Sequence, residues 1–89
     1  MALFDLLGRR WTLRVLWELR EEALTFRELQ ARCGGMSSSV LNQRLRELRQ
    51  AQVVAVHDGR GYELTTEGHA LLDALSPLNA WAARWSQRA

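Results

Sequence analysis

The sequence predicts a mainly α fold with a small β-hairpin, formed by a single domain over residues 1–89. Two short helical patterns flank a glycine turn, a hairpin pattern follows them, and apolar helical patterns stand at both ends of the chain. This order is typical of a winged helix-turn-helix domain with N- and C-terminal dimerisation helices. We expect the helix-turn-helix over about 25–51, the wing over about 53–64 and the C-terminal dimerisation helices over about 66–88.

Length and composition fit one small globular domain. Of 89 residues, 47% are hydrophobic and 25% are charged, and no apolar run is long enough to span a bilayer. No secretion signal is expected, and the single cysteine cannot form a disulfide within the chain, so we expect a cytoplasmic protein. The net charge is only +2, but all 12 basic residues are arginines, which bind phosphates and guanine edges. A genomic preference for Arg explains that composition equally well.

Two helices are predicted before the helix-turn-helix. The first runs from Ala2 to Leu7 and is stopped by Gly8. The second runs from Trp11 to about Glu21 and is apolar nearly all the way round. A helix that is apolar on every side is normally buried on every side. Because a monomer this short is only marginally stable, we expect one side to meet a second subunit.

Capping residues mark the helix-turn-helix itself. Thr25 and Glu28 form a capping-box pattern at the start of one helix. The glycines at 34–35 end that helix by a left-handed route, and Ser37 is a good N-cap for the next. The predicted buried stripe of the second helix is Leu41, Leu45 and Leu48.

After residue 51 the spacing of apolar residues changes from that of a helix to that of a strand. Residues 53–56 and 62–64 are predicted strands, and the turn formers at 57–61 connect them as a hairpin that must pack on the helices. Thr65 is a favourable N-cap for a following helix. We expect Pro77 to break that helix and to start a last one.

The helix after Ser37 has a polar face opposite its buried stripe. Nearly every side chain there is a hydroxyl, amide or guanidinium group, whereas a face built only for solubility is richer in Glu and Lys. In the major groove Asn and Gln pair with adenine, Arg pairs with guanine, and a small apolar side chain contacts the thymine methyl. The predicted DNA-binding residues are Ser37, Ser38, Ser39, Val40, Asn42, Gln43, Arg44, Arg46, Arg49 and, in the hairpin, Arg60.

These contacts are expected to differ in kind. Arg46 and Arg49 should contact the DNA backbone. The residues placed to reach base edges or phosphates are Ser38, Ser39, Val40, Asn42, Gln43 and Arg44. Arg60 either reaches a minor groove or phosphate or is a turn arginine in water. An alternative function is a winged helix that binds another protein and no DNA, which would fit the weak net charge.

Neither catalysis nor metal binding is expected. His57, His69 and Cys33 lack the spacing of metal ligands, and Cys33 lies on the apolar side of its helix. Gly59 and Gly61 form a hairpin tip without the helix that a phosphate-binding loop needs. We therefore predict that the protein is not an enzyme and has no cofactor and no metal.

Aromatic residues of the terminal helices are predicted to form a dimer interface or a ligand pocket between subunits. Aromatic side chains are enriched in cores and interfaces, so filling these is the simpler interpretation. A pocket for a small-molecule effector can coincide with an interface. The residues are Trp11, Trp17, Leu78, Trp81 and Trp85.

Four segments read, in order, WTLRVLWEL, FRELQ, SSSVLNQRLREL and YELTTEGHALL, and together they cover almost the whole chain. In this order they resemble the HxlR-type winged-helix regulators of bacteria and archaea. The resemblance implies a homodimer that presents two recognition helices to double-stranded DNA at a palindromic operator, an inverted repeat. It also implies a repressor or activator that answers aldehydes, electrophiles or other stress signals.

Three departures limit the resemblance. The family often has a sensor cysteine near its N-terminus, and residues 1–5 contain none, so thiol sensing is not implied there. Its hairpin is usually longer and proline-rich, and Pro usually stands where this chain has Ser38. The short hairpin would also suit a related winged-helix family such as the MarR type.

Overall fold

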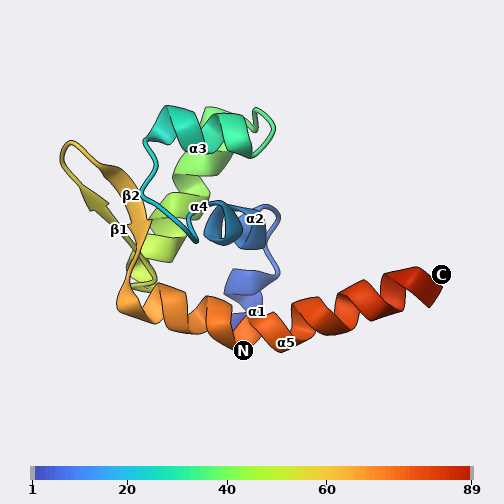
Figure 1. Cartoon of the computed structure of the whole chain (residues 1–89). Helices are drawn as coiled ribbons and strands as arrows, with labels where there is room; N and C mark the ends of the chain where they lie inside the picture. The colour runs from blue at the N-terminus through green and yellow to red at the C-terminus, as the bar shows by residue number, and fades with distance from the viewer. Residues whose placement is uncertain (1, 89) are drawn as a thin grey trace.

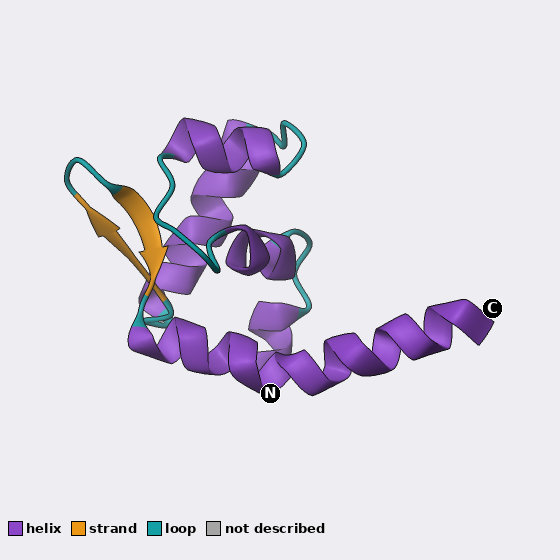
Figure 2. Ribbon diagram, viewed as in Figure 1, coloured by secondary structure: helices purple, strands orange, loops and turns teal. Residues whose placement is uncertain are grey.

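A computed structural model describes residues 2–88 and confirms a mainly helical chain with one antiparallel hairpin (Figure 1). Figure 2 shows that the hairpin stands to one side of the helices and that one long helix extends away from them. The elements in chain order are α1 (Ala2–Leu7), α2 (Thr12–Glu18), α3 (Phe26–Arg32), α4 (Ser38–Gln50), β1 (Val54–His57), β2 (Gly61–Leu64) and α5 (Thr66–Arg88).

The three predicted leucines of α4 lie at the centre of the hydrophobic core. Leu41, Leu45 and Leu48 are buried, which confirms the predicted stripe and fixes which side of α4 is turned outward. The other buried apolar residues are Val15, Leu16, Leu19, Leu24, Leu29, Cys33, Met36, Val53, Val54 and Leu64.

Both predicted caps of the helix-turn-helix are present. Thr25 Oγ1 accepts the Glu28 N–H at 3.2 Å, and Glu28 Oε1 accepts the Thr25 N–H at 2.9 Å. These hydrogen bonds hold the pKa of Glu28 below its usual value, and the one from the Thr25 backbone N–H has the larger effect. Ser37 Oγ accepts the Val40 N–H at 3.2 Å and caps α4.

An amide that sequence analysis missed ties the two helices together. Gln30 donates from Nε2 to the Met36 carbonyl oxygen at 2.8 Å and lies 3.2 Å from the Ser38 hydroxyl. Between them, Gly34 and Gly35 have φ of 75° and 74°, as expected of residues that end a helix. The turn therefore holds the start of α4 in a defined position.

Helix α2 is shorter than predicted. It begins at Thr12 and ends at Glu18, not at about Glu21. The chain turns earlier because Leu24 must reach Tyr62 of β2, with which it exchanges two backbone hydrogen bonds of 2.9 and 2.7 Å. This bridge anchors the hairpin to the segment before α3.

The first strand, β1, begins one residue later than predicted. The second strand, β2, begins one residue earlier than predicted. Val54 pairs with Leu64, and His57 pairs with Gly61. Val53 lies outside this ladder because its carbonyl oxygen accepts the N–H of Thr65 instead, at 3.1 Å.

Helix α5 is one helix where two were predicted. It runs from Thr66 to Arg88 with Pro77 inside it, so the expected break at Pro77 is wrong. Proline removes one N–H donor and crowds the preceding turn, which kinks a helix without necessarily ending it. Helix α5 changes direction in its middle, and its second half projects from the rest of the chain, where packing does not oppose a bend (Figure 1).

Candidate nucleic-acid interface

The outward side of α4 is polar over most of its length. Because the leucine stripe is buried, the opposite side of the helix carries side chains that water or a ligand can reach. An α-helix fits the major groove of B-DNA, where hydroxyl, amide and guanidinium groups can pair with base edges. We call the exposed residues of α4 and its N-cap the outer face of α4: Ser37, Ser38, Ser39, Asn42, Arg46, Arg49 and Gln50.

One shoulder of α4 is covered instead. The Arg44 and Glu47 side chains are only 14% and 15% exposed. They form an ion pair in which Arg44 Nη1 lies 3.4 Å from Glu47 Oε1. Val40 is half-buried against the core. Gln43 lies between Ser39 of the opposite side and Glu47 of this shoulder, and it is half-buried at the edge of a groove of about 870 Å³ that α4 shares with α1 and α5. Arg44 thus lies off the outer face, although the helical pattern placed it among the exposed residues.

Glu47 connects α4 to the segment after α1. Its Oε2 lies 3.4 Å from Arg9 Nε and accepts a hydrogen bond from Gln43 Nε2 at 3.0 Å. Gln43 Oε1 in turn accepts a hydrogen bond from Arg46 Nη1 at 2.7 Å. Sequence analysis missed this network, although the spacings of three and four within α4 were a local signal.

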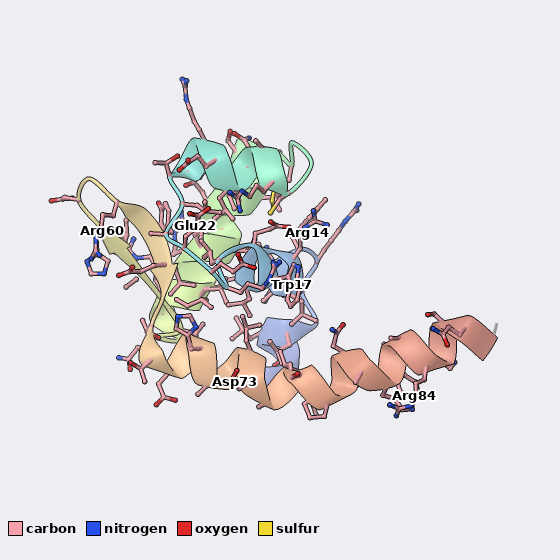
Figure 3. All side chains as sticks on the ribbon, viewed as in Figure 1. Arg14, Trp17, Glu22, Arg60, Asp73 and Arg84 are labelled. Atoms are coloured by element: carbon pink, nitrogen blue, oxygen red, sulfur yellow. The ribbon has the colours of Figure 1, made fainter. Side chains whose placement is uncertain are left out.

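The wing residue Arg60 lies on the hairpin loop (Figure 3). Its Nη2 is 3.5 Å from Glu63 Oε1, and His57 Nε2 is 2.6 Å from the same oxygen. The Glu63 carboxylate therefore offsets part of the positive charge that the wing would offer to phosphate.

The five predicted interface or pocket residues lie in three places. Trp11 is half-buried against the core just before α2. Trp17 and Leu78 line a groove of about 620 Å³ between α2 and α5. Trp81 and Trp85 stack on each other on the projecting half of α5, with ring centroids 5.9 Å apart. The structure thus brings together only two of the five in a groove.

Large apolar side chains are exposed on the terminal helices and on α2. Trp17, Trp81 and Trp85 are 47%, 51% and 59% exposed. Exposed apolar side chains that lie together, as the stacked Trp81 and Trp85 do, are typical of interaction sites. The other exposed residues of this group are Leu3, Phe4, Leu13 and Leu78.

Other site chemistry is limited in the described part of the chain. Within residues 2–88, His, Cys, Asp and Glu side chains form no group of three that could hold a metal ion. No helix in that range is long and apolar enough to cross a membrane. Cys33 is buried, and desolvation, with a smaller contribution from Glu18, raises the pKa of its thiol against the opposing effect of Arg14. A buried thiol with a raised pKa is a poor nucleophile.

Known proteins match this chain over nearly its whole length. Residues 6–89 match the HxlR-like helix-turn-helix family. The HTH-type transcriptional regulator YvaP of Bacillus subtilis is 31% identical, over 91% of this chain and 81% of that protein. An HTH-type transcriptional regulator of Methanocaldococcus jannaschii is 28% identical, over 98% of this chain and 85% of its own length.

A solved structure agrees with these sequence matches. Quinone-bound YodB from B. subtilis is 31% identical and superposes with a TM-score of 0.86, covering 93% of this chain and 92% of its own. The fold and the family match both indicate a helix-turn-helix regulator in which α4 is the second helix of the motif. The chain belongs to the HxlR-like helix-turn-helix family of DNA-binding transcriptional regulators.

Proposed function

We propose that this protein acts in the cytoplasm as a homodimer that binds an inverted-repeat DNA operator with sequence preference. The observation that carries the proposal is the outer face of α4, whose polar side chains stand opposite three buried leucines. The helix fits the major groove, and its hydrogen-bonding side chains would face the base edges there.

Residues along α4 have different tasks in this proposal. Ser38, Ser39 and Asn42 lie in the N-terminal half, which enters deepest, and contact base edges. Arg49 lies in the last turn and contacts phosphate, which positions the protein. Arg44, which is covered and paired with Glu47, supports the helix from its side.

The exposed apolar residues support the homodimer. Trp81 and Trp85 form a stacked pair on a helix that extends away from the core, where a monomer leaves them in water. A two-fold dimer uses the same surface on both copies, so it would cover these rings twice. Such a dimer presents two α4 helices in opposite directions, which is the symmetry of an inverted repeat.

We also propose that the groove between α2 and α5 binds a small aromatic effector. Its volume, about 620 Å³, lies in the range of small-molecule sites, and its walls include Leu13, Trp17, Leu72 and Leu78. The structure of YodB contains a bound quinone. In this chain the buried Cys33 is poorly placed for attack on an electrophile, so non-covalent binding is the better supported mode.

We expect the parent protein to select an inverted repeat from a random DNA pool at near-physiological salt, with half-sites about one helical turn apart. Asn42→Ala should lower the preference for one base pair in each half-site about tenfold, because an amide contact to adenine is worth about 1–3 kcal/mol. Arg49→Ala should weaken all sequences alike and reduce the salt dependence of binding.

Arg32→Ala is the matched control for Arg49→Ala. Arg32 lies on α3, and its guanidinium pairs with Glu22 at 2.9 Å. It should change neither affinity nor preference by more than about twofold, roughly 0.4 kcal/mol. A parent that selects no motif, or an Asn42→Ala variant that weakens every sequence equally, would show that the outer face of α4 does not read bases.

An aromatic aldehyde, benzaldehyde, should quench tryptophan fluorescence with a saturable curve. Trp17→Phe should remove most of this quenching, since Trp17 is the tryptophan that lines the groove between α2 and α5. Trp85→Phe is the control and should retain it. Quenching that rises without saturation, and equally in all three proteins, would reflect collisions in solution and reject the groove as the binding site.

A further inference from the structure

A chain of contacts along α4 fixes the orientation of one amide. Gln43 donates from Nε2 to Glu47 Oε2 at 3.0 Å, and Gln43 Oε1 accepts from Arg46 Nη1 at 2.7 Å. The two ends of a glutamine amide have nearly the same shape, so the neighbouring groups decide which end points where. Here the two neighbours have opposite charge and favour the same orientation.

The reversed amide is excluded by both neighbours. A carboxylate such as Glu47 only accepts hydrogen bonds, and a guanidinium such as Arg46 only donates them. Reversing Gln43 would set its oxygen against the carboxylate and its N–H groups against the guanidinium. Two charge-assisted hydrogen bonds would become two repulsive contacts, so a single orientation is enforced.

Glu47 is itself held from two further directions. Arg9 Nε lies 3.4 Å from Oε2, and Arg44 Nη1 lies 3.4 Å from Oε1. Because the Glu47 side chain is mostly covered, it stands back from the outer face of α4 that DNA would approach. Gln43 contacts both Glu47 and Arg46 of the outer face, so it links the covered carboxylate to that surface.

We propose that Glu47 is a specificity-determining residue that contacts no base and fixes the order in which Gln43 presents donor and acceptor. After its two contacts, Gln43 retains one N–H and one acceptor position on its oxygen. Adenine presents an acceptor, N7, beside a donor, the N6 amine, so an amide of fixed order distinguishes A·T from T·A. This inference rests on the proposed function, since it requires α4 in the major groove.

The test compares the DNA motifs selected by the parent, E47Q, Q43A and the double variant. E47Q keeps the size of the side chain but offers both a donor and an acceptor, so only the exposed Arg46 still favours one orientation of Gln43. We expect the preference at one base pair per half-site to fall about tenfold. Affinity for unselected DNA should rise, because an acid has been removed from α4. In the Q43A background, E47Q should change no base preference.

Two further variants make the comparison specific. E21Q removes the same charge from a side chain that is 77% exposed and pairs with Arg20, and it should leave the motif unchanged. R46M removes the second partner of the amide and should reduce the same base preference, so the inference remains testable if E47Q does not fold. Melting curves followed by circular dichroism establish which variants are folded.

The outcomes separate this inference from the proposed function. A parent protein that selects no motif refutes the proposed function, and with it the role of Glu47. A parent motif that E47Q selects unchanged refutes only the role of Glu47. An effect of E47Q that persists undiminished in the Q43A background means that Glu47 does not act through Gln43, and it also overturns the inference.

Discussion

Gly68→Ala is expected to destabilise the folded protein by about 2 kcal/mol, although alanine is the better helix former. Gly68 lies in the first turn of α5, and a Cβ added there would overlap the Val53 carbonyl oxygen and lie 3.1 Å from its carbonyl carbon. Neither backbone atom can rotate away, so we expect a cost at the upper end of the overpacking range, about 3 kcal/mol. Helix propensity returns only about 1 kcal/mol.

The overlap matters further because the same carbonyl holds the start of α5. Val53 accepts the Thr65 N–H at 3.1 Å, and Thr65 Oγ1 donates to the Gln52 carbonyl at 2.7 Å. The same hydroxyl accepts the Gly68 N–H at 3.1 Å and caps the helix. Moving α5 to admit a methyl group would strain these hydrogen bonds, two of which join the start of the helix to the segment just before β1.

Thermal unfolding at one fixed protein concentration measures the effect. We expect the midpoint of Gly68→Ala to lie about 10 °C below that of the parent, given about 4–8 °C per kcal/mol in a domain of this size. His69→Ala introduces the same residue at the next position, where the side chain is exposed, and should move the midpoint by less than about 3 °C. A Gly68→Ala protein as stable as the parent would mean that α5 does not pack on Val53.

Local patterns predicted α4 because its signals lie within a few residues of one another. The Ser37 hydroxyl caps a helix whose leucines at spacings of three and four are all buried. Thr25 and Glu28 likewise form their capping box within four residues. The outer face followed from the same spacing, since burial of one stripe exposes the opposite one.

The features that were missed or predicted wrongly depend on distant contacts or on the absence of opposing packing. No pattern near Glu47 indicates that Arg9 lies beside it, so the covered shoulder could not be separated from the outer face. Gly68 resembles a weak helix residue until Val53 is seen against it. Pro77 obeyed the rule for a helix break, yet a projecting helix can bend at proline and continue.

Replacing Trp81 and Trp85 together by glutamate is expected to split the proposed homodimer and to lower operator affinity at least about 100-fold. The two rings are more than half exposed and stack on each other, so their loss leaves the core around α4 intact. Buried charges without partners would disrupt an apolar interface. A dimer that binds two half-sites at once has an affinity about 10²–10⁴ times higher than that of a monomer on a single half-site.

Light scattering and binding to two DNA lengths distinguish loss of the dimer from loss of the DNA site. The double variant should have the monomer mass and bind a single half-site as well as a parent monomer does, because the outer face of α4 is unchanged. Ala83→Glu adds charge two residues after Trp81, on the other side of the helix, and should remain dimeric. A double variant that stays dimeric and keeps full operator affinity would place the subunit contact elsewhere and leave the tryptophan pair without this role.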